Sequence, residues 1–193
     1  MEEEPSCVVV CWQLNGQNQL QAGKRSGFWA ISEEEADMFE TILVCLDGSK
    51  LAEQIMPYAT EEAIRFQGKL VLLQVVQEPV TFGPGFPGEA PVPIQTDTMV
   101  EGTKEALNRA GNYLEKLAAP LRKRGIQIET VAIPGRAGEA ILDYANTNSI
   151  DLITIATHGR GGLRRVVFGS VADHVLRESG LPVLVIRPQD EKG

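Results

Sequence analysis

The chain has 193 residues, 43% of them hydrophobic, and a formal net charge of −8. This length predicts one ordinary domain with a packed core and about forty residues to spare. The acidic balance argues against nucleic acid as a partner. No apolar run approaches the ~18 residues of a membrane helix, so we also expect no membrane as a partner. Three cysteines, with Cys7 and Cys11 as a lone CxxxC, predict neither a disulfide framework nor a zinc site.

The first 37 residues differ in composition from the rest, because seven acidic residues stand there against two basic ones. No helical or alternating period persists in them. We therefore predict a poorly ordered acidic extension over 1–37, with a short regulatory or docking tail as the alternative. The start MEEEPSCVVVCWQ is acidic where a secretory signal is basic, which favours a cytoplasmic location. The organised domain is expected over 38–188, followed by a tail over 189–193.

From Thr41 onward, apolar runs typical of buried strands alternate with helical patterns. TILVCL (41–46) predicts the first strand, and Ser49 after it is a suitable N-cap for a helix that is closed by Gly68. KLVLLQVV (69–76) predicts the second strand. The following stretch, 77–95, contains five prolines and three glycines and predicts a long loop.

The second half of the chain continues this alternation. An apolar stripe that begins at Leu107 predicts a helix that ends at Gly125. Shorter helices are predicted over 138–148 and 170–179, and further strands over 126–133, 151–157 and 182–187. Strands that are apolar on both faces and alternate with helices indicate an α/β fold, with a five-stranded parallel, doubly wound sheet and helices on both faces.

Two strand ends carry unusual chemistry. The first strand ends in Asp47-Gly48-Ser49, and the fourth runs into a glycine-rich segment that also holds Arg160, Arg164 and Arg165. In a doubly wound sheet a ligand lies at the carboxyl ends of the strands, where the winding direction reverses. Glycines permit close approach of the backbone, and the free N–H groups at the start of a helix suit phosphate. The segment therefore predicts a phosphate site, with a plain tight turn as the alternative.

The glycine spacing excludes two common phosphate motifs and matches another. No lysine precedes Ser170 as Walker A requires, and Arg164 stands where the dinucleotide fingerprint needs its third glycine. The chain resembles the universal stress protein family over residues 38–188, through ILVCLDGS, LVLLQVV, ATHGRGGLRRVVFGSVADHVL and PVLVIRP. The ATP-binding branch of that family has a glycine, two residues, a glycine, nine residues, and glycine with serine or threonine. Gly159 and Gly169-Ser170 match this spacing, whereas Ala156 replaces the first glycine.

The resemblance implies a Rossmann-like strand order of 3-2-1-4-5, which makes the first and fourth strands neighbours. It implies ATP as the ligand, together with Mg²⁺, and a homodimer that pairs through the C-terminal strand. The implied contacts with adenine and ribose are Cys45, Leu46, Asp47, Val75, Ile155 and Ala156. The implied contacts with the phosphates are Gly159, Arg160, Gly169, Ser170 and Val171. Cys45 departs from the family pattern, which often has proline there.

No catalytic residue is predicted. Hydrolysis needs a base near the γ-phosphate, and the chain has only His158 and His174. His174 follows Ser170 by four residues, but no G-x-S-x-G elbow surrounds the serine, whose hydroxyl is better interpreted as a helix cap or phosphate ligand. Three hypotheses follow: an ATP-binding stress-response or regulatory module without fast catalysis, a dimeric interaction protein of the family's non-nucleotide branch, and a slow ATPase or ATP pyrophosphatase-like enzyme.

Overall fold

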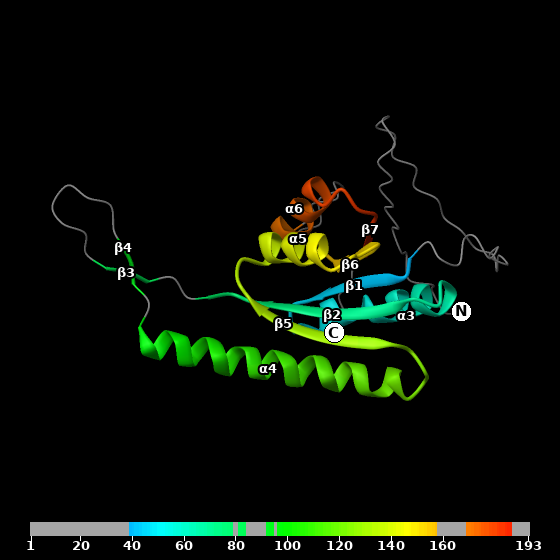
Figure 1. Ribbon diagram of the computed structural model, residues 1–193, viewed down its shortest axis with the longest axis horizontal. Coiled ribbons are helices and arrows are strands. Elements are labelled where there is room, and N and C mark those ends of the chain that lie inside the picture. Colours follow the sequence, from blue (N-terminus) through cyan, green and yellow to red (C-terminus); the bar gives the residue numbers. More distant parts are fainter. Residues whose placement is uncertain (1–38, 79–80, 84–91, 95, 158–168, 187–193) are drawn as a thin grey trace, which may run out of the picture.

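The computed structural model describes residues 39–78, 81–83, 92–94, 96–157 and 169–186, whose elements are arranged as Figure 1 shows. The predicted extension over 1–37, the predicted tail over 189–193 and most of the glycine-rich segment lie outside these residues. Five strands form the main sheet: β1 (Thr41–Leu46), β2 (Lys69–Val76), β5 (Ile128–Pro134), β6 (Leu152–Ala156) and β7 (Val183–Ile186).

The strands of the main sheet lie in the order β5-β2-β1-β6-β7 and are all parallel. Numbered along the chain within this sheet, the order is 3-2-1-4-5, which confirms the predicted fold. Cys45 of β1 pairs with Ile155 of β6, so the carboxyl ends of these two strands lie side by side. The hydroxyl of Thr154, fully buried, donates a hydrogen bond of 3.0 Å to the carbonyl of Leu43 and fastens the two strands together.

Helices cover both faces of the sheet. In Figure 1, α5 (Ala137–Thr147) and α6 (Ser170–Glu178) lie on one side, and α3 (Met56–Arg65) and α4 (Asp97–Arg122) on the other. Successive residues of a strand point to opposite faces, so a sheet with helices on both sides needs apolar residues at nearly every position. β1 meets this need, because Ile42 and Val44 belong to the core beneath α4 while Leu43 and Cys45 belong to the core beneath α5 and α6.

The single helix predicted after Ser49 is divided in two. The hydroxyl of Ser49 accepts a hydrogen bond of 3.0 Å from the backbone N–H of Ala52, which confirms the predicted cap. The first helix, α2 (Lys50–Glu53), ends after one turn, and α3 begins at Met56. Pro57 explains the break, because a proline has no N–H to donate to the carbonyl four residues earlier.

Gly68 follows α3 as predicted, but it does not adopt the left-handed conformation that a glycine at the end of a helix usually has. The left-handed residue at the end of the helix is Gln67, with a φ of 52°. The N–H of Gly68 donates to the carbonyl of Ala63 at 3.0 Å, and a Cβ on Gly68 would collide with the carbonyl oxygen of Phe39. Glycine is therefore required here by the close approach of the chain that enters β1, and not by its own backbone angles.

The structure also differs from prediction between β2 and β5. The stretch predicted as a loop contains two short antiparallel strands, β3 (Thr81–Gly83) and β4 (Val92–Ile94), so that prediction is wrong for these segments. Helix α4 begins at Asp97, well before the predicted stripe at Leu107. The apolar pattern missed its first turns because the buried side chains of the helix are confined to its later turns. Within the described part of the chain, no helix is both long enough and apolar enough to cross a bilayer.

Candidate functional site

A cavity of about 260 Å³ lies at the carboxyl ends of β1 and β6. It brings together nine of the eleven residues for which nucleotide contacts are predicted: Cys45, Leu46, Asp47, Val75, Ile155, Ala156, Gly169, Ser170 and Val171. The other two, Gly159 and Arg160, lie outside the described residues. Segments far apart in the sequence therefore meet at one place, as the topology of a doubly wound sheet requires.

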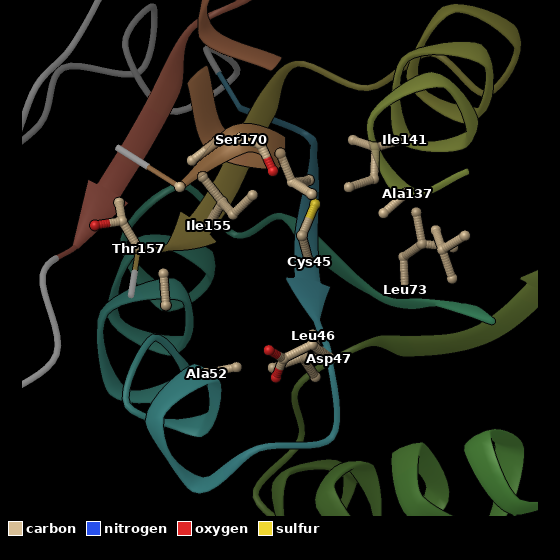
Figure 2. A pocket seen from close by; sticks show the side chains of 15 residues that line it. Cys45, Leu46, Asp47, Ala52, Leu73, Ala137, Ile141, Ile155, Thr157 and Ser170 are labelled. Carbon is tan, nitrogen blue, oxygen red and sulfur yellow. The ribbon is translucent and has the colours of Figure 1, made fainter. Parts of the chain in front are cut away.

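The walls of the cavity include residues that the sequence analysis missed. Ala137 and Ile141 of α5 lie on one side of Cys45 in Figure 2, together with Leu73 of β2. Further lining residues that were not predicted are Ala52, Thr157 and Ala172. A signal for α5 was present in the sequence, because this helix starts directly after the carboxyl end of β5, at the same edge of the sheet as the other lining segments.

Cys45 supplies an apolar surface and not a reactive group. Its side chain is 6% exposed, and burial raises the pKa of its thiol to about 12. The thiol is therefore protonated at neutral pH, whereas a nucleophile or a metal ligand needs the thiolate. Ile155, which is also buried, extends the same apolar wall on β6. Such a surface suits a flat, weakly polar ring.

The register of the sheet places a backbone carbonyl beside this wall. The N–H of Lys69 donates to the carbonyl of Glu40 at 2.7 Å, so every second residue of β2 from Lys69 onward, Val75 included, turns its backbone groups toward β1. β1 ends at Leu46, opposite Gln74, and Gly48, with a φ of 84°, turns the chain away. The carbonyl of Val75 consequently faces the cavity beyond the last residue of β1.

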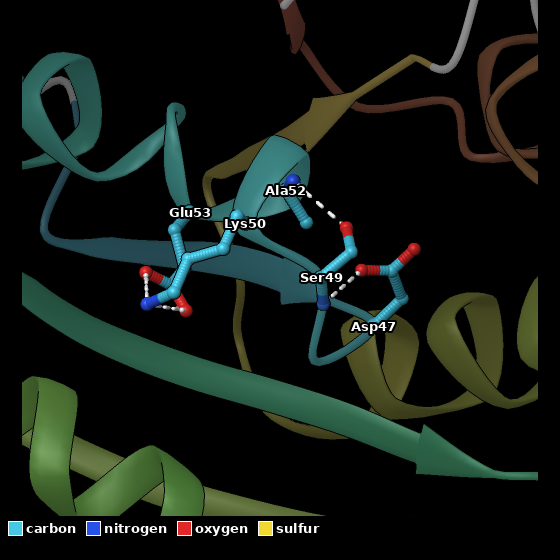
Figure 3. Close-up of polar contacts among 5 residues, drawn as sticks. All are labelled: Asp47, Ser49, Lys50, Ala52 and Glu53. Atoms are coloured by element: carbon cyan, nitrogen blue, oxygen red, sulfur yellow. Dashed lines mark hydrogen bonds and ion pairs between the residues drawn. The ribbon is translucent and has the colours of Figure 1, made fainter. Parts of the chain in front are cut away.

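Asp47 stands at the rim of the cavity in a loop with well-defined hydrogen bonds. Its Oδ1 accepts from the N–H of Ser49 at 2.9 Å, and Ser49 in turn caps α2, as Figure 3 shows. Lys50 forms an ion pair of 2.8 Å with Glu53 one turn later. This loop therefore presents one carboxylate to the cavity in a fixed position, where it can accept from hydroxyl groups or contact a cation.

The start of α6 forms the polar end of the cavity. Gly169 is the N-cap, with φ −60° and ψ 156°, and it provides no side-chain hydrogen bond to the helix. The first N–H groups of any α-helix have no partner within the helix and carry its positive dipole end. A Cβ on Gly169 would meet no atom within 4 Å, so a side chain at this position would not clash with the described residues.

His174 does not form the pair with Ser170 that their spacing suggests. Its ring packs against α5, where a Cβ on Gly138 would lie 2.6 Å from the imidazole Cδ2. Among the described residues that line the cavity there is no histidine, and Asp47 is the one carboxylate. The described residues also contain no group of three or more side chains of the kinds that hold a metal ion.

Comparison with known proteins identifies the family. A family model described as the universal stress protein family matches residues 38–187. The chain belongs to the universal stress protein family. Universal stress protein YxiE of Bacillus subtilis is 32% identical over 152 residues, which cover 78% of this chain and all of that protein.

Solved structures show the same universal stress protein fold. The structure of MJ0577, a protein of Methanocaldococcus jannaschii, aligns with a TM-score of 0.62 at 22% identity, over 80% of this chain and 99% of that one. A universal stress protein solved in complex with cAMP aligns with a TM-score of 0.51 at 19% identity, over 77% of this chain and 96% of that one.

Proposed function

We propose that this universal stress protein is a regulatory module that binds ATP, with Mg²⁺, in the cavity between β1 and β6, and that it does not turn ATP over quickly. The observation that carries the proposal is the convergence of nine predicted contact residues on one cavity, at the carboxyl ends of adjacent parallel strands. The apolar wall around Cys45 suits adenine, and the Val75 carbonyl suits the exocyclic amino group of that base.

The remaining parts of the cavity suit the rest of the nucleotide. The Asp47 carboxylate would accept hydrogen bonds from the ribose hydroxyls or face the cation, since Mg²⁺ is commonly held by one or two carboxylates together with phosphate oxygens. The N–H groups at the start of α6 would donate to the phosphates, with the Ser170 hydroxyl beside them. Bound Mg²⁺ would supply charge neutralisation for these phosphates.

We expect slow turnover because the described residues provide no evident general base for hydrolysis at the γ-phosphate. A hydrolytic site needs a base that positions and deprotonates water. The Cys45 thiol is protonated, and one Asp47 oxygen is already engaged by the N–H of Ser49. His174 packs against α5. We therefore expect ATP to act as a bound signal for this protein more than as a substrate.

Calorimetric titration of the purified chain with ATP, cAMP and adenosine, each with and without Mg²⁺, tests the proposal. We expect saturable one-to-one binding of ATP that strengthens with Mg²⁺. The volume of about 260 Å³ is below the ~300–1,000 Å³ typical of ligand sites and favours a smaller adenine nucleotide as the second candidate. Binding of cAMP without ATP would establish that candidate, and binding of none of the three would favour the non-nucleotide interaction protein.

We also propose that the protein forms a homodimer through β7, which ends the order of the main sheet. Ile153 and Thr157 donate to the carbonyls of Pro182 and Ile186, so Val183 and Val185 turn their backbone groups away from β6. An edge with such outward-facing backbone groups is usually covered, and pairing with a second copy would cover it.

Replacing Val185 by proline should convert the dimer to a monomer without unfolding it. Proline removes the outward N–H of Val185 but no hydrogen bond to β6. A charged residue at this position would instead disrupt the hydrophobic core, because Val185 is only 3% exposed. Sedimentation velocity measures the result. Leu184→Pro, which removes an N–H that faces β6, is the matched control and should destabilise the fold itself. A wild-type protein that sediments as a monomer would contradict the proposed dimer.

A further inference from the structure

The main sheet has a second edge, β5, on the side opposite β7. The N–H of Leu70 donates to the carbonyl of Gln127, and the N–H of Gly135 donates to the carbonyl of Val76. Successive residues of a strand turn their backbone groups to opposite sides, so the odd-numbered residues of β5 bond to β2. The residues that turn their backbone groups outward are Ile128, Thr130, Ala132 and Pro134.

Arg122, the last residue of α4, occupies the first outward carbonyl of β5, along which this helix lies (Figure 1). Its Nε donates to the carbonyl of Ile128 at 3.1 Å. Its two terminal nitrogens donate to the two carboxylate oxygens of Glu115, at 2.5 and 3.2 Å. Glu115 also accepts from the hydroxyl of Thr130. The guanidinium is therefore held from two sides, by the backbone of β5 and by a carboxylate that is itself bonded to β5, in the geometrically specific fork of an arginine–carboxylate pair.

A proline blunts the other end of the same edge. Pro134 is the last residue of β5, is exposed and lies opposite Val76 of β2. Another residue at this position would present an N–H outward, whereas proline has none and cannot lose this property by a movement of its side chain. Natural sheets commonly protect an exposed edge with proline and with charged side chains. β7, with the sequence VLVI, contains neither.

We propose that Arg122 and Pro134 guard the β5 edge against pairing with β5 of a second copy, so that the sheets of two chains can join through β7 only. Two identical edges can pair antiparallel about a two-fold axis. If both edges of a chain were open, pairing through β7 and through β5 would alternate from chain to chain, and the sheet would have no natural end. A guard on one edge limits such an assembly to two copies.

The double variant Arg122→Ala/Pro134→Thr removes the guard. It releases the carbonyl of Ile128 and restores an outward N–H at position 134. Sedimentation velocity over a range of concentrations should show a shift to species larger than those of the wild type. Hydrogen exchange should become slower at the outward amides of Thr130 and Ala132, because these would then donate to the second strand.

Lys123→Ala is the matched control for the lost charge, since it removes an exposed cation one residue later and should behave as wild type does. Val185→Pro, added to the double variant, separates the two edges: with β7 blocked, assembly through β5 should stop at pairs. If the wild-type chain sediments as a monomer, the proposed dimer fails, and the double variant should then form pairs through β5.

A double variant that sediments as the wild type does would overturn the guard. Larger species without slower exchange at Thr130 and Ala132 would also overturn it, because they would not arise from pairing of β5. If the double variant does not fold, Pro134→Thr alone, at an exposed position, decides by the same two measurements.

Discussion

Replacing Gly169 by aspartate is expected to abolish ATP binding, with a loss of about a hundredfold or more, while the domain stays folded. The new Cβ would enter open space, and the backbone at φ −60° accepts any residue. Aspartate is a favoured N-cap and should stabilise α6, relative to glycine, by a few tenths of a kcal/mol. Its carboxylate would stand in front of the N–H groups that we assign to the phosphates, and two unit charges about 4 Å apart near a protein surface repel by about 4 kcal/mol.

Gly169→Asn is the matched control, because asparagine has nearly the same shape and is an equally good N-cap but carries no charge. Calorimetry with ATP and with adenosine measures the effect, and thermal unfolding measures stability. Both variants should melt at or above the wild-type temperature, and both should keep most of their affinity for adenosine. The aspartate variant should lose much more affinity for ATP than the asparagine variant. If Gly169→Asp bound ATP as wild type does, the phosphates would not lie at the start of α6.

Gly68→Ala is expected to be the most destabilising exchange of one small residue for another in the described part of the chain. The added methyl group would collide with the backbone carbonyl of Phe39 and press on that of Glu40 at 3.1 Å. The Glu40 oxygen cannot move freely, since it accepts from the N–H of Lys69 at 2.7 Å and Glu40 leads directly into β1. We expect a loss of about 3 kcal/mol, at the upper end of the range for overpacking.

Thermal unfolding of the chain measures this loss, which should lower the melting temperature by about 6–12 °C for a domain of this size. Gly102→Ala is the control, because Gly102 lies within α4 and a Cβ there meets no atom within 4 Å. That exchange should leave the melting temperature unchanged or raise it, since alanine is favoured over glycine in a helix by about 1 kcal/mol. Equal melting temperatures for wild type and Gly68→Ala would contradict the close approach of α3 to the start of β1.

The main sheet could be predicted from the sequence because each of its strands is a short apolar run closed by turn residues. TILVCL and KLVLLQVV coincide with β1 and β2 to the residue. The first half of α4 could not be predicted in the same way. Its turns before Leu107 bury no side chain and carry no apolar stripe, and Gly102 lies among them. The division between α2 and α3 could have been predicted, since Pro57 lies inside the pattern that was interpreted as one helix.

The candidate site was predictable where it depends on strand ends and glycine spacing, and less so where it depends on packing between helices. Asp47, Ser170 and their neighbours follow strands or open a helix, which are positions that topology brings to one edge. Ala137 and Ile141 belong to an ordinary amphipathic helix and carry no chemical signal of their own. The position of His174 also depends on packing, because the sequence does not show that it faces Gly138 of α5.

The uneven burial along α4 has a consequence for local unfolding. Its buried side chains, Ala110, Leu114 and Ala118, all lie in the later part of its 26 residues. The earlier turns are held by the helix's own hydrogen bonds and by exposed ion pairs such as Lys104 with Glu101 at 3.8 Å, which add little stability. These turns can open at a small fraction of the free energy of global unfolding, so their amide hydrogens exchange with solvent while those of β1 and β6 remain protected.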